Sequence, residues 1–126
     1  MNDTQARKSA AVEFLHMVIA GRIAEAYEKH VDMDGKHHNP FFPAGFSSLR
    51  DAMMENHLQM PNKQLMVKNV VGDGNLVAVH SRLVLRTGES EMAVVHIFRF
   101  EGERIVEMWD CGQMVPADSP NRDGAF

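Results

Sequence analysis

The first 60 residues carry apolar side chains at a helical spacing. Apolar residues recur there every three or four positions, which places them along one side of a helix. This spacing predicts three helices, over residues 3–20, 22–30 and 48–57. The segment between the second and third helices, residues 31–46, contains two prolines and two glycines. We therefore expect it to hold at most a short extended piece before a loop.

After Pro61 the pattern changes to the alternation that is typical of strands. The apolar segments are KQLMVKNVV (63–71), NLVAVHSRLVLR (75–86), EMAVVHIFRF (91–100) and RIVEMWDCGQ (104–113). The compact turns GDG, TGES and EGE separate them, which is the pattern of an antiparallel meander. The chain is therefore predicted to be one α+β domain over residues 1–126, with three N-terminal helices packed on a curved antiparallel sheet and a loose tail over 115–126.

Both faces of the predicted sheet are rich in apolar residues. On the second strand, Val77 and Val79 point to one face, whereas Ala78 and Val84 point to the other with His80 and Arg82 among them. One small layer of helices cannot cover both faces. We therefore expect the second, outer face to be buried against another copy of the chain in a homodimer.

Ionisable residues interrupt the apolar pattern inside three neighbouring strands. If the turn around Gly88 has three residues, His80 lies opposite His96. If Gly102 lies in another three-residue turn, His96 lies opposite Asp110. The three side chains would then form one row, with neighbouring Cβ atoms about 5 Å apart. A slip of one residue would move them to opposite faces.

Such a row is suited to acid–base chemistry if it faces a cavity. A carboxylate beside an imidazole can hold the ring in one tautomer or exchange a proton with a substrate. The apolar residues predicted on the same face, and so expected to line this cavity, are Val94, Phe98, Val106 and Met108. The alternative is that His96 and Asp110 form a satisfied structural pair in a solid core.

Composition and charge exclude several other classes. A net charge of −4 and a pI near 5.9 leave no basic footprint for nucleic acid. No apolar run approaches the roughly 18 residues that a membrane span needs. The single cysteine, Cys111, excludes an internal disulfide framework and fits a reducing compartment, so we expect a cytoplasmic protein.

Three stretches together resemble a known family. They are HHNP (37–40), VAVHSR (77–82) and IFRFEGERIVEMWDCGQMVP (97–116). They are similar to the SnoaL-like polyketide cyclase group of the nuclear-transport-factor-2-like superfamily, and WDCGQ is the most specific part. The resemblance covers most of the chain. It implies a cone-shaped, cystatin-like α+β barrel with a deep pocket between helices and sheet, and usually a homodimer formed through the outer sheet face.

The resemblance also implies roles for particular residues. Characterised cyclases of this group close a ring by an intramolecular aldol reaction without metal or cofactor, using an aspartate as acid/base and a histidine on the neighbouring strand. Asp110 and His96 match that pair, and His80 matches the group's strand histidine. His38 and Asn39 match its loop at the cavity mouth.

Two departures from the group's pattern affect what the resemblance implies. Many relatives read HWD where this chain has Met108-Trp109-Asp110, and many carry aspartate in place of His96. These departures leave open whether the acid/base set is arranged as in the group, and the substrate of the best-known cyclases is not carried over to this chain.

The leading hypothesis is a cofactor-independent lyase or isomerase that acts on a small, largely apolar carbonyl compound. Asp110 would remove an acidic C–H proton, while His96 and His80 orient it or stabilise the enolate oxygen. Arg82 and the residues of the loop and walls would contact the substrate. The alternatives are a non-catalytic ligand-binding domain with the same pocket and a site where two histidines and a carboxylate ligate iron or zinc.

Overall fold

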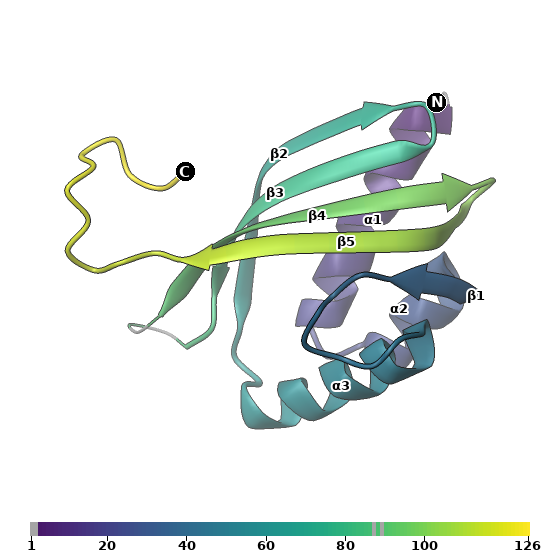
Figure 1. The fold of residues 1–126 in the computed structure, drawn as a ribbon, viewed down its shortest axis with the longest axis horizontal. Helices are drawn as coiled ribbons and strands as arrows, with labels where there is room; N and C mark the ends of the chain where they lie inside the picture. The colour runs from purple at the N-terminus through teal and green to yellow at the C-terminus, as the bar shows by residue number, and fades with distance from the viewer. Residues whose placement is uncertain (1–2, 87, 89) are drawn as a thin grey trace.

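The structure, a computed structural model, describes residues 3–86, 88 and 90–126. Its elements in chain order are α1 (Asp3–Ile19), α2 (Ile23–His30), β1 (Val31–His37), α3 (Phe46–Gln59), β2 (Gln64–Asp73), β3 (Leu76–Val84), β4 (Glu91–Glu101) and β5 (Arg104–Met114). Figure 1 shows the helices on one side of a curved sheet. The predicted α+β class, with three helices and four antiparallel strands, is confirmed.

The helices end and begin where the backbone or the core requires it. Gly21, with φ of +88°, separates α1 from α2, and a Cβ at this position would overlap the His57 ring. The third helix begins at Phe46, two residues before the expected start at Ser48, and the Phe46 side chain is fully buried in the core. The residue before it, Gly45, makes no side-chain capping bond.

The sheet has a fifth strand that the sequence pattern did not predict. The strand order is β1-β5-β4-β3-β2, and β1 pairs with β5 in parallel. At Gly35 the two backbones come so close that an added Cβ would overlap the Val106 carbonyl oxygen and lie 2.8 Å from Phe46 Cε2. Residues 31–46 were expected to be mostly loop. Their first part, Val31–His37, is instead a strand of the sheet.

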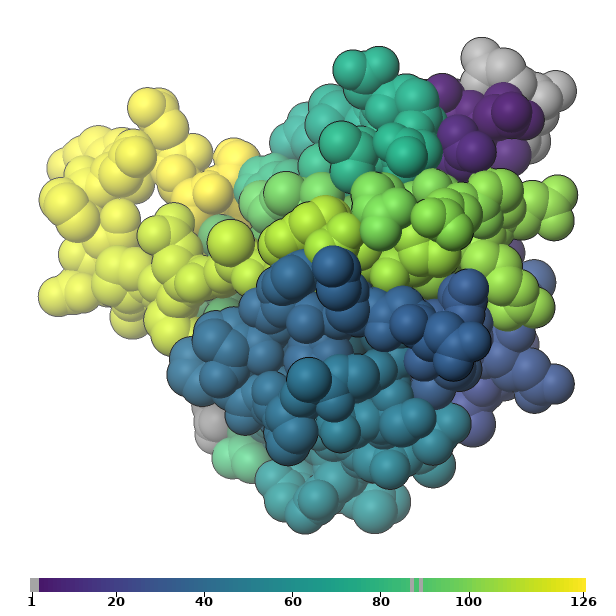
Figure 2. Space-filling model, turned by 45° about the vertical axis from the view of Figure 1, so that its right-hand side comes forward, coloured from purple at the N-terminus to yellow at the C-terminus, as the bar shows by residue number. Residues whose placement is uncertain are grey.

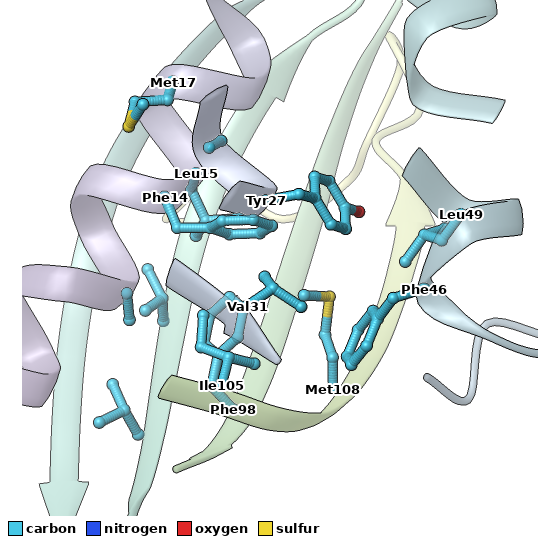
Figure 3. Close-up of a cluster of buried hydrophobic side chains, with 14 of the residues drawn as sticks. Phe14, Leu15, Met17, Tyr27, Val31, Phe46, Leu49, Phe98, Ile105 and Met108 are labelled. Atoms are coloured by element: carbon cyan, nitrogen blue, oxygen red, sulfur yellow. The ribbon is translucent and has the colours of Figure 1, made fainter. Parts of the chain in front are cut away.

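The core lies between the helices and one sheet face, which we call the inner face. Figure 3 shows side chains from α1, α2, α3 and the sheet meeting there. Phe14 makes edge-to-face contacts with Tyr27 at 5.2 Å and with Phe98 at 5.9 Å between ring centroids, and Tyr27 meets Phe46 at 6.3 Å. Full burial of one such side chain stabilises the fold by roughly 1.5–3 kcal/mol.

The register between β3 and β4 differs by one residue from the prediction. Val84 pairs with Glu91, and beyond this pair the Leu85 N–H donates to the Ser90 carbonyl at 3.1 Å. Four residues, 86–89, therefore lie between the last two hydrogen-bonded residues, where three were predicted. Two residues of the predicted turn TGES, 87 and 89, lie outside the described residues. As a result His80 pairs with Val95, and its side chain points to the opposite, outer face.

The register between β4 and β5 brings His96 opposite Asp110, as predicted. The turn itself is tighter than expected, because Glu101 pairs with Arg104 and only Gly102 and Glu103 lie between them. A β-bulge after this turn then shifts the pairing by one residue. The predicted pair is thus produced by a two-residue turn and a bulge instead of a three-residue turn.

The chain after β5 contains no helix or strand. Figures 1 and 2 show it projecting from one end of the molecule (yellow). Its last ring, Phe126, returns to the outer face, where it lies 6.2 Å from the His80 ring and near Lys68 and Arg82. Across the described residues, none of the helices is long and apolar enough to cross a membrane.

Candidate functional site

His96 and Asp110 face each other on the inner face of the sheet, directly across β4 and β5. The next inward pair along these strands is Phe98 and Met108, both buried in the core. The His96 ring stacks on Phe98 with centroids 6.1 Å apart and an interplanar angle of 11°. No hydrogen bond joins His96 to Asp110 within the described structure.

Burial governs the chemistry of His96. Removal of the ring from water lowers the pKa of His96 below its ordinary value, while the nearby Asp110 charge opposes this shift. The Nδ1 atom is buried and has no hydrogen-bond partner among the described residues. Because buried polar atoms are nearly always hydrogen-bonded, a neutral imidazole with an unpaired nitrogen is suited to receive a polar atom of a ligand.

Asp110 is held at one of its two oxygens. The Asn39 side-chain NH2 donates to Oδ2 at 2.9 Å, and the side-chain oxygen Oδ1 of Asn39 accepts the Phe41 backbone N–H at 3.0 Å. The second carboxylate oxygen, Oδ1, has no hydrogen bond to any described residue. Asp110 therefore has a fixed orientation and one free basic oxygen. The contact of Asn39 with Asp110 was not part of the prediction, which placed Asn39 only on a loop at the cavity mouth.

His38 lies away from this pair, in contrast to the expectation that it contacts the substrate. Its ring stacks on Trp109 with centroids 5.2 Å apart, and Nε2 lies 2.6 Å from Glu107 Oε2. Arg99 also donates to Glu107, at 2.9 Å. The hydrogen bonds from His38 and then Arg99 lower the pKa of Glu107. Trp109, Glu107 and Arg99 belong to the outer face, because they alternate with Asp110, Met108 and Phe98 along the strands.

His80 and Arg82 also lie on the outer face, so the predicted row of three is wrong in its third member. The His80 ring contacts the Asn69 side chain at 3.0 Å, and Arg82 pairs with Glu91 at 2.6 Å. The physical reason is the one-residue difference in the β3–β4 connection, which reverses the direction of each side chain on β3 relative to His96.

The same shift brings an unpredicted residue, Ser81, to the inner face. Ser81 is fully buried, and its hydroxyl has no hydrogen-bond partner among the described residues. The alternation of residues 77–82 contained the signal for it, since Ser81 shares a face with Val79 whenever His80 points away.

Tyr27 was also missed, because its place on the apolar stripe of α2 suggests only a core side chain. It is 2% exposed. Burial raises the pKa of Tyr27, and the charge of Asp110 adds to this effect while Arg50 opposes it. The phenol therefore stays protonated near Asp110 and can donate a hydrogen bond.

The hollows described on the surface lie elsewhere. One hollow, of about 360 Å³, is lined by Arg7, Lys29, His30, Phe100 and neighbouring residues. Neither it nor the other two described hollows is lined by His96 or Asp110. The four predicted wall residues Val94, Phe98, Val106 and Met108 are all buried, and Val106 is the bulged residue without a partner on β4. The cavity around the pair therefore stays a prediction.

Within the described ranges, no group of three or more His, Cys, Asp or Glu side chains is arranged to hold a metal ion. The metal hypothesis needed His80 beside His96 and Asp110, and that arrangement is removed by the register of β3.

Comparison with known proteins connects this geometry to a family. The family model described as "SnoaL-like domain" matches residues 11–108, a match that ends two residues before Asp110. No match was found among curated proteins.

Solved structures share the fold at low identity. A protein from Kribbella flavida provisionally named a ketosteroid isomerase is 20% identical with a TM-score of 0.72, over 98% of this chain and 89% of its own. IdmH from Streptomyces antibioticus, provisionally named a polyketide cyclase, is 20% identical with a TM-score of 0.67, over 84% of this chain and 91% of its own. An NTF2-like protein of unknown function from Cytophaga hutchinsonii is 16% identical with a TM-score of 0.67, over 85% and 89%.

Proposed function

Because this chain belongs to the SnoaL-like domain family, we propose that it is a cofactor-independent lyase or isomerase that transfers a proton on a small, largely apolar carbonyl compound. The observation that carries the proposal is the facing pair of His96 and Asp110, with one carboxylate oxygen fixed by Asn39 and the other free. The provisional names of two structural relatives, a ketosteroid isomerase and a polyketide cyclase, support this reaction class.

In the proposed reaction, Asp110 Oδ1 removes a proton from the carbon next to the carbonyl. The electron pair of that C–H bond forms the C=C bond of an enolate, and the carbonyl π pair moves to oxygen. His96 donates a hydrogen bond to this oxygen where its negative charge develops. In an isomerisation the carbonyl re-forms and Asp110 returns the proton to another carbon of the conjugated system. In an aldol closure the enolate carbon attacks a second carbonyl of the same molecule, a C–C bond forms, the π pair of that carbonyl moves to its oxygen, and Asp110 returns the proton to this alkoxide.

The test measures exchange of acidic C–H protons for deuterium in D2O, by NMR, over a panel of small ketones and β-ketoesters. A positioned general base contributes about 10²–10⁴-fold, so Asp110→Asn is expected to slow exchange by that factor. Asp73→Asn, which changes an exposed carboxylate on β2, is the matched control and is expected to leave the rate unchanged. Exchange by Asp110→Asn at the native rate would show that the role given to Asp110 is wrong.

A second candidate function is a ligand-binding domain without catalysis. It is favoured by the unpartnered Nδ1 of His96 and the free Oδ1 of Asp110, which can orient a polar ligand without transferring a proton. The same panel separates the two functions. Compounds that shift the resonances of residues around Asp110 but exchange no protons beyond the buffer rate would favour binding alone.

We further propose that the protein is a cytoplasmic homodimer joined through the outer sheet face. Apolar side chains are exposed there, including Val71 at 62% and Leu76 at 42%. The free, exposed Cys111 fits a reducing compartment.

A further inference from the structure

Asn39 directly follows two histidines with opposite surroundings, His37 at the end of β1 and His38 after it. His37 is 7% exposed and lies on the side of the core, where its ring is 6.3 Å from that of Phe46. His38 lies against Trp109 on the outer face, and its backbone N–H donates to the Met108 carbonyl at 2.9 Å. The chain is therefore anchored on both faces of the sheet just before Asn39, the residue that contacts Asp110.

The two ring nitrogens of His37 have defined and different partners. Nε2 lies 2.8 Å from the Pro43 carbonyl oxygen, which can only accept, so Nε2 carries the hydrogen and donates it. Nδ1 accepts the backbone N–H of Asn39 at 3.1 Å. Both bonds exist together only in the neutral ring with its hydrogen on Nε2, because protonation of Nδ1 would remove the acceptor.

These bonds determine where the Asn39 side chain points. The backbone N–H of Asn39 is held by His37, and its side-chain oxygen Oδ1 is held by the Phe41 N–H at 3.0 Å. The remaining group, the side-chain NH2, is thereby directed at Asp110 Oδ2, 2.9 Å away. The chain of contacts runs from Pro43 through His37 and Asn39 to the carboxylate.

We infer that His37 is a positioning residue, which sets the Asn39 amide on Asp110 and so selects which carboxylate oxygen stays free to act as base. The inference rests on the proposed function in assigning a reaction to Asp110, but the positioning itself does not depend on it. His37 does not touch the reacting atoms. A misplacement of about 1 Å transmitted through Asn39 is enough to lower turnover by up to about 10²-fold.

Two substitutions separate this role from simple filling of the core. His37→Asn places an oxygen near the position of Nδ1, so it keeps an acceptor for the Asn39 N–H. His37→Gln keeps a donor for the Pro43 carbonyl and leaves the Asn39 N–H without its acceptor. His16→Asn, which changes an exposed histidine on α1, is the control.

The first readout is NMR and needs no substrate. In the unaltered protein, long-range ¹H–¹⁵N spectra of the His37 ring are expected to give the neutral form with its hydrogen on Nε2. The Asn39 backbone and side-chain amide resonances are expected to move in His37→Gln, with faster hydrogen exchange of the backbone amide, and to stay near their native positions in His37→Asn and His16→Asn. A ring with its hydrogen on Nδ1, or Asn39 resonances unmoved in His37→Gln, would overturn the inference.

The second readout is the rate of deuterium exchange into a responsive ketone. His37→Gln is expected to lower kcat by about 10-fold or more with little change in KM, and His37→Asn to recover most of it. Equal loss in both variants would mean that His37 acts by packing alone, which also overturns the inference. If the unaltered protein exchanges no compound of the panel, the proposed function fails while the NMR result still decides whether His37 positions Asn39.

Discussion

His96 places a titratable ring among apolar neighbours, which ties its charge to the stability of the fold. Burial lowers the pKa of His96 in the folded chain relative to the unfolded chain, and Asp110 only opposes this effect. As the pH falls, the unfolded chain therefore takes up this proton first. Burial, opposed by Glu13, acts on His30 in the same direction and lowers the pKa of His30.

We predict that the stabilisation by the neutral, buried histidines is complete above about pH 6.5, and that the free energy of unfolding falls as the pH drops from there toward 5. One proton contributes at most about 1.4 kcal/mol per pH unit, and His96→Gln is expected to reduce the slope by up to that amount. Urea unfolding between pH 5 and 7.5 measures it. A hydrogen bond from Lys29 lowers the pKa of Glu13, and one from His38 lowers the pKa of Glu107. These two carboxylates therefore change the free energy of unfolding only below about pH 4.5, outside the range of the measurement. Identical slopes for the two proteins would contradict the prediction.

The residues of the site differ in how far the sequence could predict them. The prediction that His96 lies opposite Asp110 rests on the alternation of side chains along two strands joined by a short turn, and the observed pairing confirms it. The place of His80 depended on whether the β3–β4 connection has an odd or even number of residues, which composition does not determine. Ser81 and His80 exchange faces for that one reason. Tyr27 shares the pattern of any buried helix residue, so its nearness to Asp110 is visible only in three dimensions.

At the scale of elements, β1 shows why a polar segment can be a strand. Its sequence, VDMDGKH, lacks the apolar run of a central strand, so its pattern predicted mainly loop. Its pairing with β5 is possible because Gly35 lets the two backbones approach. This strand also carries His37 and leads directly to Asn39, so the approach at Gly35 supports the site.

We predict that Gly35→Ala lowers the free energy of unfolding by about 1–3 kcal/mol, because the new methyl group overlaps the Val106 carbonyl and cannot move away from backbone. Gly112→Ala on β5 is the control. There the nearest atom is the end of the flexible Met92 side chain, at 3.1 Å, and we expect a smaller effect. Chemical denaturation compares the two, and equal stability losses would mean that the contact between β1 and β5 is not limiting.

At the scale of the whole molecule, the helices cover only the inner face of the sheet. Figure 1 shows the outer face free of helices, and the described tail adds only the Phe126 ring there, near Lys68 and Arg82. The rest of this face combines apolar side chains with the ion pairs of Glu107 and Arg99. The two-faced apolar pattern of the sequence predicted this arrangement, since side chains of a strand alternate regardless of register.

The centre of the outer face offers a direct test of the proposed homodimer. Ile97 lies there between Ala78 on β3 and Trp109 on β5. Ile97→Glu would bury a carboxylate without a partner in such an interface, so we predict that it raises the dimer dissociation constant by about 100-fold or more, equivalent to about 2.7 kcal/mol. Sedimentation velocity over a concentration series measures this constant. Phe41→Ser, which removes an 87% exposed ring on the loop, is the control and is expected to remain dimeric. A monomeric unaltered protein at tens of micromolar would contradict the dimer, whereas an unchanged constant for Ile97→Glu would move the interface away from the sheet.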